Sequence, residues 1–124
     1  MKKENAIKKK SYGFALRIIK LCLWLRDNKH YEISNQLLRS GTSIGANVEE
    51  ALAGHSRKDF LHKITIASKE ARETNYWLRL MRDSDMIAEA KLESLLLESE
   101  TIINILYAIV KTTSSNNFKL KTKY

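Results

Sequence analysis

Apolar side chains recur at alternating steps of four and three residues along most of this chain, and no proline interrupts them. The clearest run lies in the middle of the sequence and comprises Phe60, Ile64, Ala67, Ala71, Thr74, Leu78 and Met81. This spacing puts every member on one face of an α-helix and is typical of a bundle seam. With only four glycines among 124 residues, the chain lacks the turn residues of a many-stranded fold. We therefore expect an all-α protein.

The first half of the chain contains two such helical segments. One runs from Tyr12 to Leu25, and the other extends from about Ile33 to Ala53, where Gly54 supplies a stop signal. The second segment contains two internal glycines, Gly41 and Gly45, which each cost about 1 kcal/mol relative to alanine in a helix. We therefore expect another helix to approach closely at these glycines.

The second half contains two more segments. Ser56 and Asp59 form a capping-box-like start for the third helix, which reaches about residue 82. The sequence Asp83, Ser84, Asp85 then breaks the pattern, and we expect Asp85 to cap a fourth helix that reaches Val110. Because the connections are short, consecutive helices should be antiparallel, and the predicted fold is an up-and-down four-helix bundle.

The first segment is apolar on two sides. One stripe suits the core of the bundle and comprises Phe14, Ile18, Leu21, Cys22 and Leu25. Leu16, Ile19, Leu23 and Trp24 lie outside that stripe and leave too narrow a polar face for a peripheral helix. Only one face of this helix can point at the other three helices. We therefore expect the second face to pack against another copy of the chain, as a homo-oligomer.

Charge is concentrated at the two ends of the sequence. Residues 1–10 hold five lysines and one glutamate, and residues 111–124 hold four lysines and no acid, so each segment carries +4. The remaining residues hold 13 basic and 13 acidic side chains, so the formal net charge of +8 derives from the ends. We expect a flexible basic arm at 1–10, a bundle at 11–113 and a flexible basic tail at 114–124. Such arms either bind polyanions such as RNA or DNA, or only solubilise the protein.

The sequence offers no recognisable catalytic or metal-binding constellation. A di-metal site in a helical bundle needs Glu-x-x-His pairs, which are absent, and no glycine-rich phosphate loop is present. Glu70 and Glu73 could share a helix face as a carboxylate pair, but neutralising partners such as Lys69, Arg72 and Arg39 favour ion pairs over acid/base catalysis. We therefore expect no enzyme, no catalytic residues, no metal and no cofactor. Because we find no secretory signal and no long apolar run, we also expect a cytoplasmic protein that does not contact membranes.

The outer face of the third helix is the best candidate for a binding surface. At helical spacing it carries Lys58, His62, Thr65, Lys69, Arg72, Tyr76 and Arg79, with no acid among them. The cations could neutralise phosphates while the tyrosine stacks on a base, so we assign Lys58, Lys69, Arg72, Tyr76 and Arg79 as candidate nucleic-acid ligands. The alternative is an ordinary solvated helix face.

Three sequence segments carry a family resemblance. RSGTSIGANVEEA (39–51), SRKDFLHKITIASKEARETNYWLRL (56–80) and LYAIVKT (106–112) closely resemble the bacterial four-helix bundle protein family, which includes proteins encoded in intervening sequences of 23S rRNA genes. The resemblance implies an antiparallel four-helix protomer and a ring-like homopentamer. It does not imply an established reaction.

The family signature falls on positions that include polar residues. It covers Arg39, Ser40, Ser43, Ile44, Asn47, Glu50, Phe60, Glu73 and Thr74. For the polar members we favour a structural role, with Asn47 and Glu50 as buried groups that fix the register of the helices. Two functions remain open: a non-enzymatic oligomeric scaffold that binds RNA or DNA, and an adaptor for another protein, such as one encoded nearby.

Overall fold

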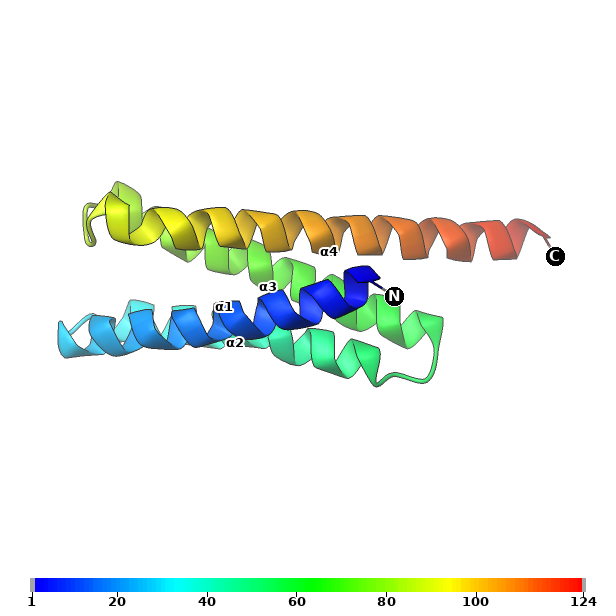
Figure 1. Cartoon of the computed structure of the whole chain (residues 1–124), viewed down its shortest axis with the longest axis horizontal. Coiled ribbons are helices and arrows are strands. Elements are labelled where there is room, and N and C mark those ends of the chain that lie inside the picture. The colour runs from blue at the N-terminus through cyan, green and yellow to red at the C-terminus, as the bar shows by residue number, and fades with distance from the viewer. Residues whose placement is uncertain (1, 124) are drawn as a thin grey trace.

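Four α-helices make up the protein in a computed structural model, which describes the backbone of residues 2–123 and the side chains of residues 5–115. They are α1 (Lys2–Asp27), α2 (Tyr31–Leu52), α3 (Arg57–Asp83) and α4 (Glu89–Lys123), and no strand occurs in this part of the chain. Each helix contacts the next, and α4 closes loosely onto α1 (Figure 1). The all-α, up-and-down four-helix bundle predicted from the sequence is confirmed.

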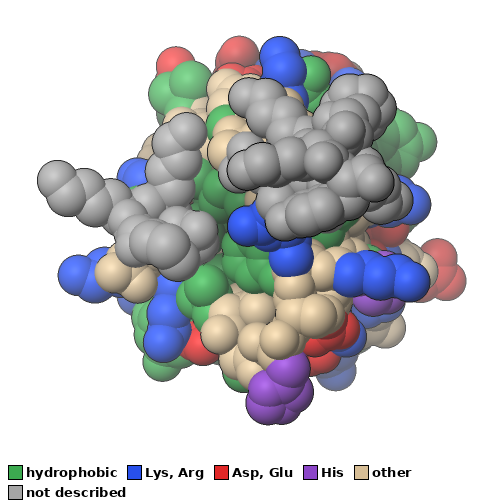
Figure 2. Space-filling view, turned by 90° about the vertical axis from the view of Figure 1, so that its right-hand side faces the viewer, with side chains coloured by type: hydrophobic (Ala, Val, Ile, Leu, Met, Phe, Trp, Pro, Cys, Tyr) green, Lys and Arg blue, Asp and Glu red, His purple; other side chains and the backbone are tan. Residues whose placement is uncertain are grey.

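An even number of alternating helices brings both ends of the chain to the same end of the bundle. The start of α1, the α2–α3 loop and the end of α4 lie there, and the other two loops lie at the opposite end (Figure 1). Seen from this end, apolar side chains are visible near the centre of the face, and most of the visible charged side chains lie toward its rim (Figure 2).

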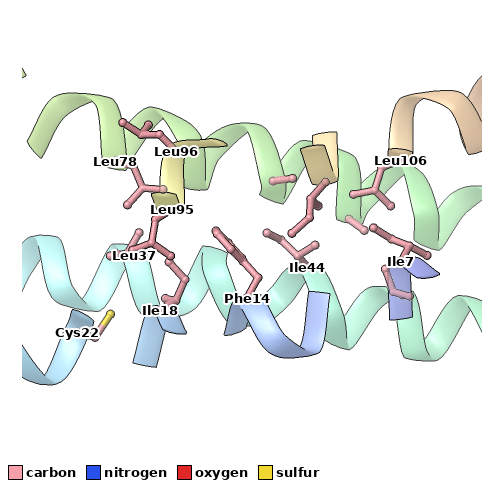
Figure 3. Packing of buried hydrophobic residues seen from close by; sticks show 14 of the residues in the cluster. Ile7, Phe14, Ile18, Cys22, Leu37, Ile44, Leu78, Leu95, Leu96 and Leu106 are labelled. Atoms are coloured by element: carbon pink, nitrogen blue, oxygen red, sulfur yellow. The ribbon is translucent and has the colours of Figure 1, made fainter. Parts of the chain in front are cut away.

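The core follows the seams that the sequence predicts. From α1, the side chains of Phe14, Ile18 and Leu25 are fully buried. Phe14 and Ile18 point toward residues of the other helices (Figure 3). The expected close approach at Gly41 is confirmed, because a Cβ built there would lie 2.7 Å from Cγ2 of Ile18. Gly45 also faces α1, where a Cβ built at this position would lie at a more ordinary 3.4 Å from the Ser11 carbonyl oxygen.

The N-terminal segment differs from the predicted flexible arm over residues 5–10. These residues belong to α1, and Ile7 is fully buried in the core. Ile7 lies seven residues before Phe14 and so extends the same seam, and adding turns to an existing helix avoids the cost of nucleation. At the other end, α4 continues through the predicted boundary at residue 113 to Lys123, while the side chains beyond residue 115 lie outside the described part.

Two loops contain a residue in the left-handed conformation. Lys29 (φ 67°) follows α1 and Asp85 (φ 59°) follows α3. After α3, the amide of Asp85 donates to the Arg82 carbonyl and the amide of Met86 donates to the Met81 carbonyl, which is the Schellman pattern. Our assignment of Asp85 to the start of α4 was therefore wrong: Asp85 terminates α3, because aspartate tolerates a left-handed backbone better than most residues.

The α2–α3 connection behaves largely as expected. The side chain of Ser56 accepts a hydrogen bond of 3.0 Å from the amide of Asp59, which confirms the predicted helix start. Gly54 follows the end of α2 but does not adopt a left-handed conformation. A Cβ at this position would lie 2.6 Å from Oδ2 of Asp59, so the glycine makes room for that carboxylate.

Candidate nucleic-acid interface

The basic stripe predicted on the third helix lies on the outside of α3. We call Lys58, Lys69, Arg72, Tyr76 and Arg79 the α3 stripe, and all five side chains are exposed. His62 is also exposed, whereas Thr65 is half-buried and donates its hydroxyl to the Leu61 carbonyl. The stripe faces outward because the buried seam of α3 occupies the opposite side of the helix.

The cations of the α3 stripe are not ion-paired with any carboxylate among the described residues. Two other basic residues of α3 behave differently. Lys63 contacts Glu50 at 2.8 Å, and Arg82 contacts Asp83 at 2.7 Å. The side chains of Lys58, Lys69, Arg72 and Arg79 therefore keep their charge available for an anionic ligand.

Tyr76 and Arg79 lie next to each other within the stripe. The guanidinium carbon of Arg79 is 5.8 Å from the centroid of the Tyr76 ring. Trp77 packs edge-on against Tyr76, with ring centroids 5.3 Å apart at an angle of 64°. On its other side, Arg79 donates Nε–H to Oδ1 of Asn75 across 2.8 Å. Asn75 was not among the predicted site residues, because its contacts depend on how α3 and α4 are aligned.

The signature residues Arg39 and Glu73 form an ion-pair cluster between α2 and α3. Arg39 contacts Glu70 at 3.0 Å and also bonds to Glu73, which in turn accepts a 3.1 Å hydrogen bond from Nε1 of Trp77. The hydrogen bond to Glu73 raises the pKa of the Arg39 guanidinium above its ordinary value. Both carboxylates thus serve in ion pairs, as the sequence suggested, with Arg39 as their shared partner.

The other polar signature residues differ in part from expectation. Asn47 is half-buried and bonds within its own helix to the carbonyl oxygen and hydroxyl of Ser43, at 2.9 and 3.0 Å. Glu50 is exposed and pairs with Lys63, so our expectation that it is buried was wrong. Glu50 is exposed because it does not share the helix face of the buried residues Ile44, Val48 and Ala51, and its carboxylate lies beside the first turns of α3.

Buried polar contacts between helices come from other residues. The hydroxyls of Thr74 and Ser40, both part of the signature, are hydrogen-bonded across 2.9 Å between α3 and α2. Asn75 donates Nδ2–H to Oγ of Ser99 at 2.9 Å, which links α3 to α4. These two contacts join neighbouring helices in the interior, whereas Asn47 bonds within α2 and Glu50 pairs with Lys63 at the surface.

A second exposed surface lies on α1. Tyr12, Leu16, Ile19 and Leu23 are exposed by 64, 48, 39 and 59%. They repeat at steps of four, three and four, so they form an apolar seam on the side of α1 that faces away from the core. We call these four residues the α1 outer seam. A helix with two such seams can pack on both sides.

We also searched residues 5–115 for a metal site, a reactive cysteine and a membrane-spanning helix. No group of three or more His, Cys, Asp or Glu side chains in this part of the chain is arranged to hold a metal ion. Cys22 is buried in the core, and its burial raises the pKa of the thiol. Within the same described part, no helix combines the length and apolar character needed to cross a bilayer.

The fold and its exposed surfaces define a small, basic four-helix bundle. Residues 3–108 match the model of the family described as 23S rRNA-intervening sequence protein, and the chain belongs to this family. This confirms the resemblance seen in the sequence.

The chain is also similar to a solved structure. It is the crystal structure of a protein with unknown function from the S23 ribosomal protein family of Bacteroides thetaiotaomicron VPI-5482. The two sequences are 44% identical, and the match covers 88% of this chain and 98% of the other with a TM-score of 0.84. Among curated proteins, none matches the chain.

Proposed function

We propose that this protein is a non-enzymatic, homo-oligomeric scaffold that binds RNA or DNA. The observation that carries the proposal is the concentration of positive charge at one end of the bundle. Residues 1–10 and 111–124 contribute +4 each, and the up-and-down order of the helices brings the start of α1 and the end of α4 to the same end. Clustered lysines attract phosphates, and their binding gains affinity by releasing condensed cations from the nucleic acid.

The α3 stripe adds to this basic end. α3 begins at the same end, and Lys58 stands at its second residue. From there, Lys69, Arg72 and Arg79 extend the positive charge along the bundle, without an ion-pair partner among the described residues. A nucleic acid held at the basic end could thus follow α3 for most of its length.

A retardation or anisotropy assay at low salt tests the proposal directly. We expect binding to RNA or DNA with a steep salt dependence. For a single strand, the slope is about −0.7 per neutralised phosphate, so about six contacts give a slope of about −4. The affinity should then fall on the order of 10²- to 10³-fold between about 50 and 200 mM salt. Absence of binding to single-stranded and structured RNA and DNA at low salt would refute the nucleic-acid role.

Self-association through the α1 outer seam is the second part of the proposal. Four exposed apolar side chains in one seam favour contact with another copy, and the family resemblance suggests a homopentamer. Light scattering should give a mass several times 14.3 kDa. The double variant Leu16→Glu/Leu23→Glu should reduce that mass. Leu97→Glu is the matched control, because Leu97 on α4 is as exposed as Leu23, at 59%.

These assays also test the alternative function, an adaptor for another protein. An adaptor that binds only another protein would assemble normally yet bind no nucleic acid. A partner captured from nuclease-treated cells would support the adaptor, because a protein partner survives the digestion. We propose the nucleic-acid scaffold first because the basic end and the α3 stripe match a polyanion in charge.

We also propose that the chain catalyses no reaction. The carboxylates closest to the signature motif are engaged by Arg39 and Lys63, so none is in the desolvated, unpaired state that general acid/base work requires.

A further inference from the structure

A chain of hydrogen bonds that begins in the core ends at the Nε atom of Arg79. Ser99 of α4 is fully buried and donates its only hydroxyl proton to the Leu96 carbonyl, across 2.8 Å. Its oxygen therefore acts as an acceptor, and Asn75 must present its amide nitrogen to it, at 2.9 Å. The amide oxygen of Asn75 then faces the other way and accepts Nε–H of Arg79, at 2.8 Å.

This arrangement fixes Nε of the Arg79 guanidinium and leaves its two terminal nitrogens free to bind a ligand. Neither terminal nitrogen has a hydrogen-bond partner among residues 5–115. The neighbouring acid Asp83 is bonded by Arg82 through two hydrogen bonds, of 2.7 and 3.3 Å. A guanidinium held at Nε offers a planar pair of donors that suits two oxygens of one phosphate, and it loses little further side-chain entropy on binding.

Tyr76 supplies an aromatic surface beside this donor pair. Its side chain is 46% exposed, and Trp77 supports the ring edge-on. Trp77 is itself anchored by its hydrogen bond to Glu73, which is paired with Arg39. The ring and the guanidinium are thus both held by side chains behind them, and they lie 5.8 Å apart.

From this geometry we infer that Arg79 and Tyr76 form a subsite for one nucleotide of a single strand. The terminal nitrogens of Arg79 bind a phosphate, the Tyr76 ring stacks on an adjacent base, and Asn75 is a positioning residue that acts through Arg79. A duplex cannot use the subsite, because its bases are already stacked on each other. The inference deepens the proposed function and rests on it.

Anisotropy of labelled polyuridine, compared with a blunt-ended RNA duplex of the same length, tests the inference at low salt. Arg79→Lys should weaken single-strand binding about tenfold, because lysine keeps the charge but loses the paired, pre-held donors. Arg57→Lys is the matched control: Arg57 is exposed on α3 outside the α3 stripe and has no hydrogen bond holding its side chain among the described residues, so its effect should stay within about twofold. Tyr76→Ala should weaken single-strand binding about tenfold, and Tyr76→Phe should change it little. Duplex binding should change little in all four variants.

The positioning role of Asn75 is tested with a measurement that a purely structural role would not change. Asn75→Ala should weaken single-strand binding in the wild-type background and have no further effect in Arg79→Lys, since the amide acts only by holding Arg79. An equal effect in both backgrounds would overturn its positioning role.

Different results would refute the nucleic-acid scaffold and the Arg79–Tyr76 subsite. If the wild-type protein binds neither RNA probe and also binds no single-stranded or duplex DNA at low salt, the proposed function fails. If it binds the probes, but Arg79→Lys behaves like Arg57→Lys and Tyr76→Ala has no effect, then the subsite is refuted and the nucleic-acid scaffold stands.

Discussion

Replacement of Gly41 by alanine tests the tightest contact between α1 and α2. In an open helical position, alanine in place of glycine stabilises by about 1 kcal/mol. At Gly41, the new Cβ would lie 2.7 Å from Cγ2 and 3.0 Å from Cγ1 of Ile18. Real atoms do not approach so closely, so the helices must shift, which typically costs about 1–3 kcal/mol. The clash outweighs the gain, and we expect Gly41→Ala to destabilise by about 1 kcal/mol.

The same substitution at Gly13 is the matched control. Nothing lies within 4 Å of a Cβ built at Gly13, so Gly13→Ala should stabilise by about 1 kcal/mol. Thermal unfolding followed by circular dichroism would then show a melting temperature about 4 °C lower for Gly41→Ala and about 4 °C higher for Gly13→Ala. All samples must share one protomer concentration, because the melting temperature of an assembling protein depends on it.

A second change at Ile18 identifies the atoms responsible. Ile18→Ala removes both Cγ atoms that crowd position 41, so Gly41→Ala should become stabilising on that background. Ile18→Val keeps both atoms and should give no such reversal. If Gly41→Ala raised the melting temperature of the unmodified protein as much as Gly13→Ala does, the close approach of the two helices would be refuted.

Three further predictions concern the buried interior. Ile7→Ala should lower the free energy of unfolding in urea by about 2–5 kcal/mol, because Ile7 is fully buried, while the exposed neighbour Asn5→Ala should change it by less than about 0.5 kcal/mol. Thr74→Val should cost about 1 kcal/mol in the same assay, since it removes the hydrogen bond between the buried Thr74 and Ser40 hydroxyls, and Thr74→Ser should restore most of the loss. Burial raises the pKa of Cys22, so less of the reactive thiolate forms at neutral pH, and a thiol reagent should modify the native protein far more slowly than the urea-unfolded chain.

The positions of the helices could be predicted from the sequence because their signals are local. The seam of α3, the cap at Ser56 and the tight contact at Gly41 each follow from a few neighbouring residues, and the structure confirms them. Ile7 was missed because five lysines and one glutamate dominate residues 1–10, although its spacing from Phe14 continues the seam of α1. Asp85 was misassigned because aspartate suits both the start of a helix and the left-handed residue after one.

The details of the candidate site could be predicted only in part. Helical spacing alone puts the α3 stripe on one face, and the structure finds those side chains exposed. The contact from Ser99 through Asn75 to Arg79 depends on the alignment of α3 and α4 along their axes, which no local pattern in the sequence specifies. Arg39 likewise appeared as one of several cations near Glu70 and Glu73, and only the packing of α2 on α3 selects it.

Salt dependence can separate the two kinds of contact that the α3 stripe offers. Neutralisation of phosphates by lysine releases counter-ions, so each lost contact reduces the slope of affinity against salt by about 0.7 for a single strand. Stacking on Tyr76 releases no ions. Lys58→Gln/Lys69→Gln should therefore flatten the slope by about 1.4, whereas Tyr76→Ala should lower the affinity by a similar factor at every salt concentration. If Tyr76→Ala caused no uniform loss of affinity across salt concentrations, Tyr76 would contribute no stacking, and the basic residues alone would account for binding.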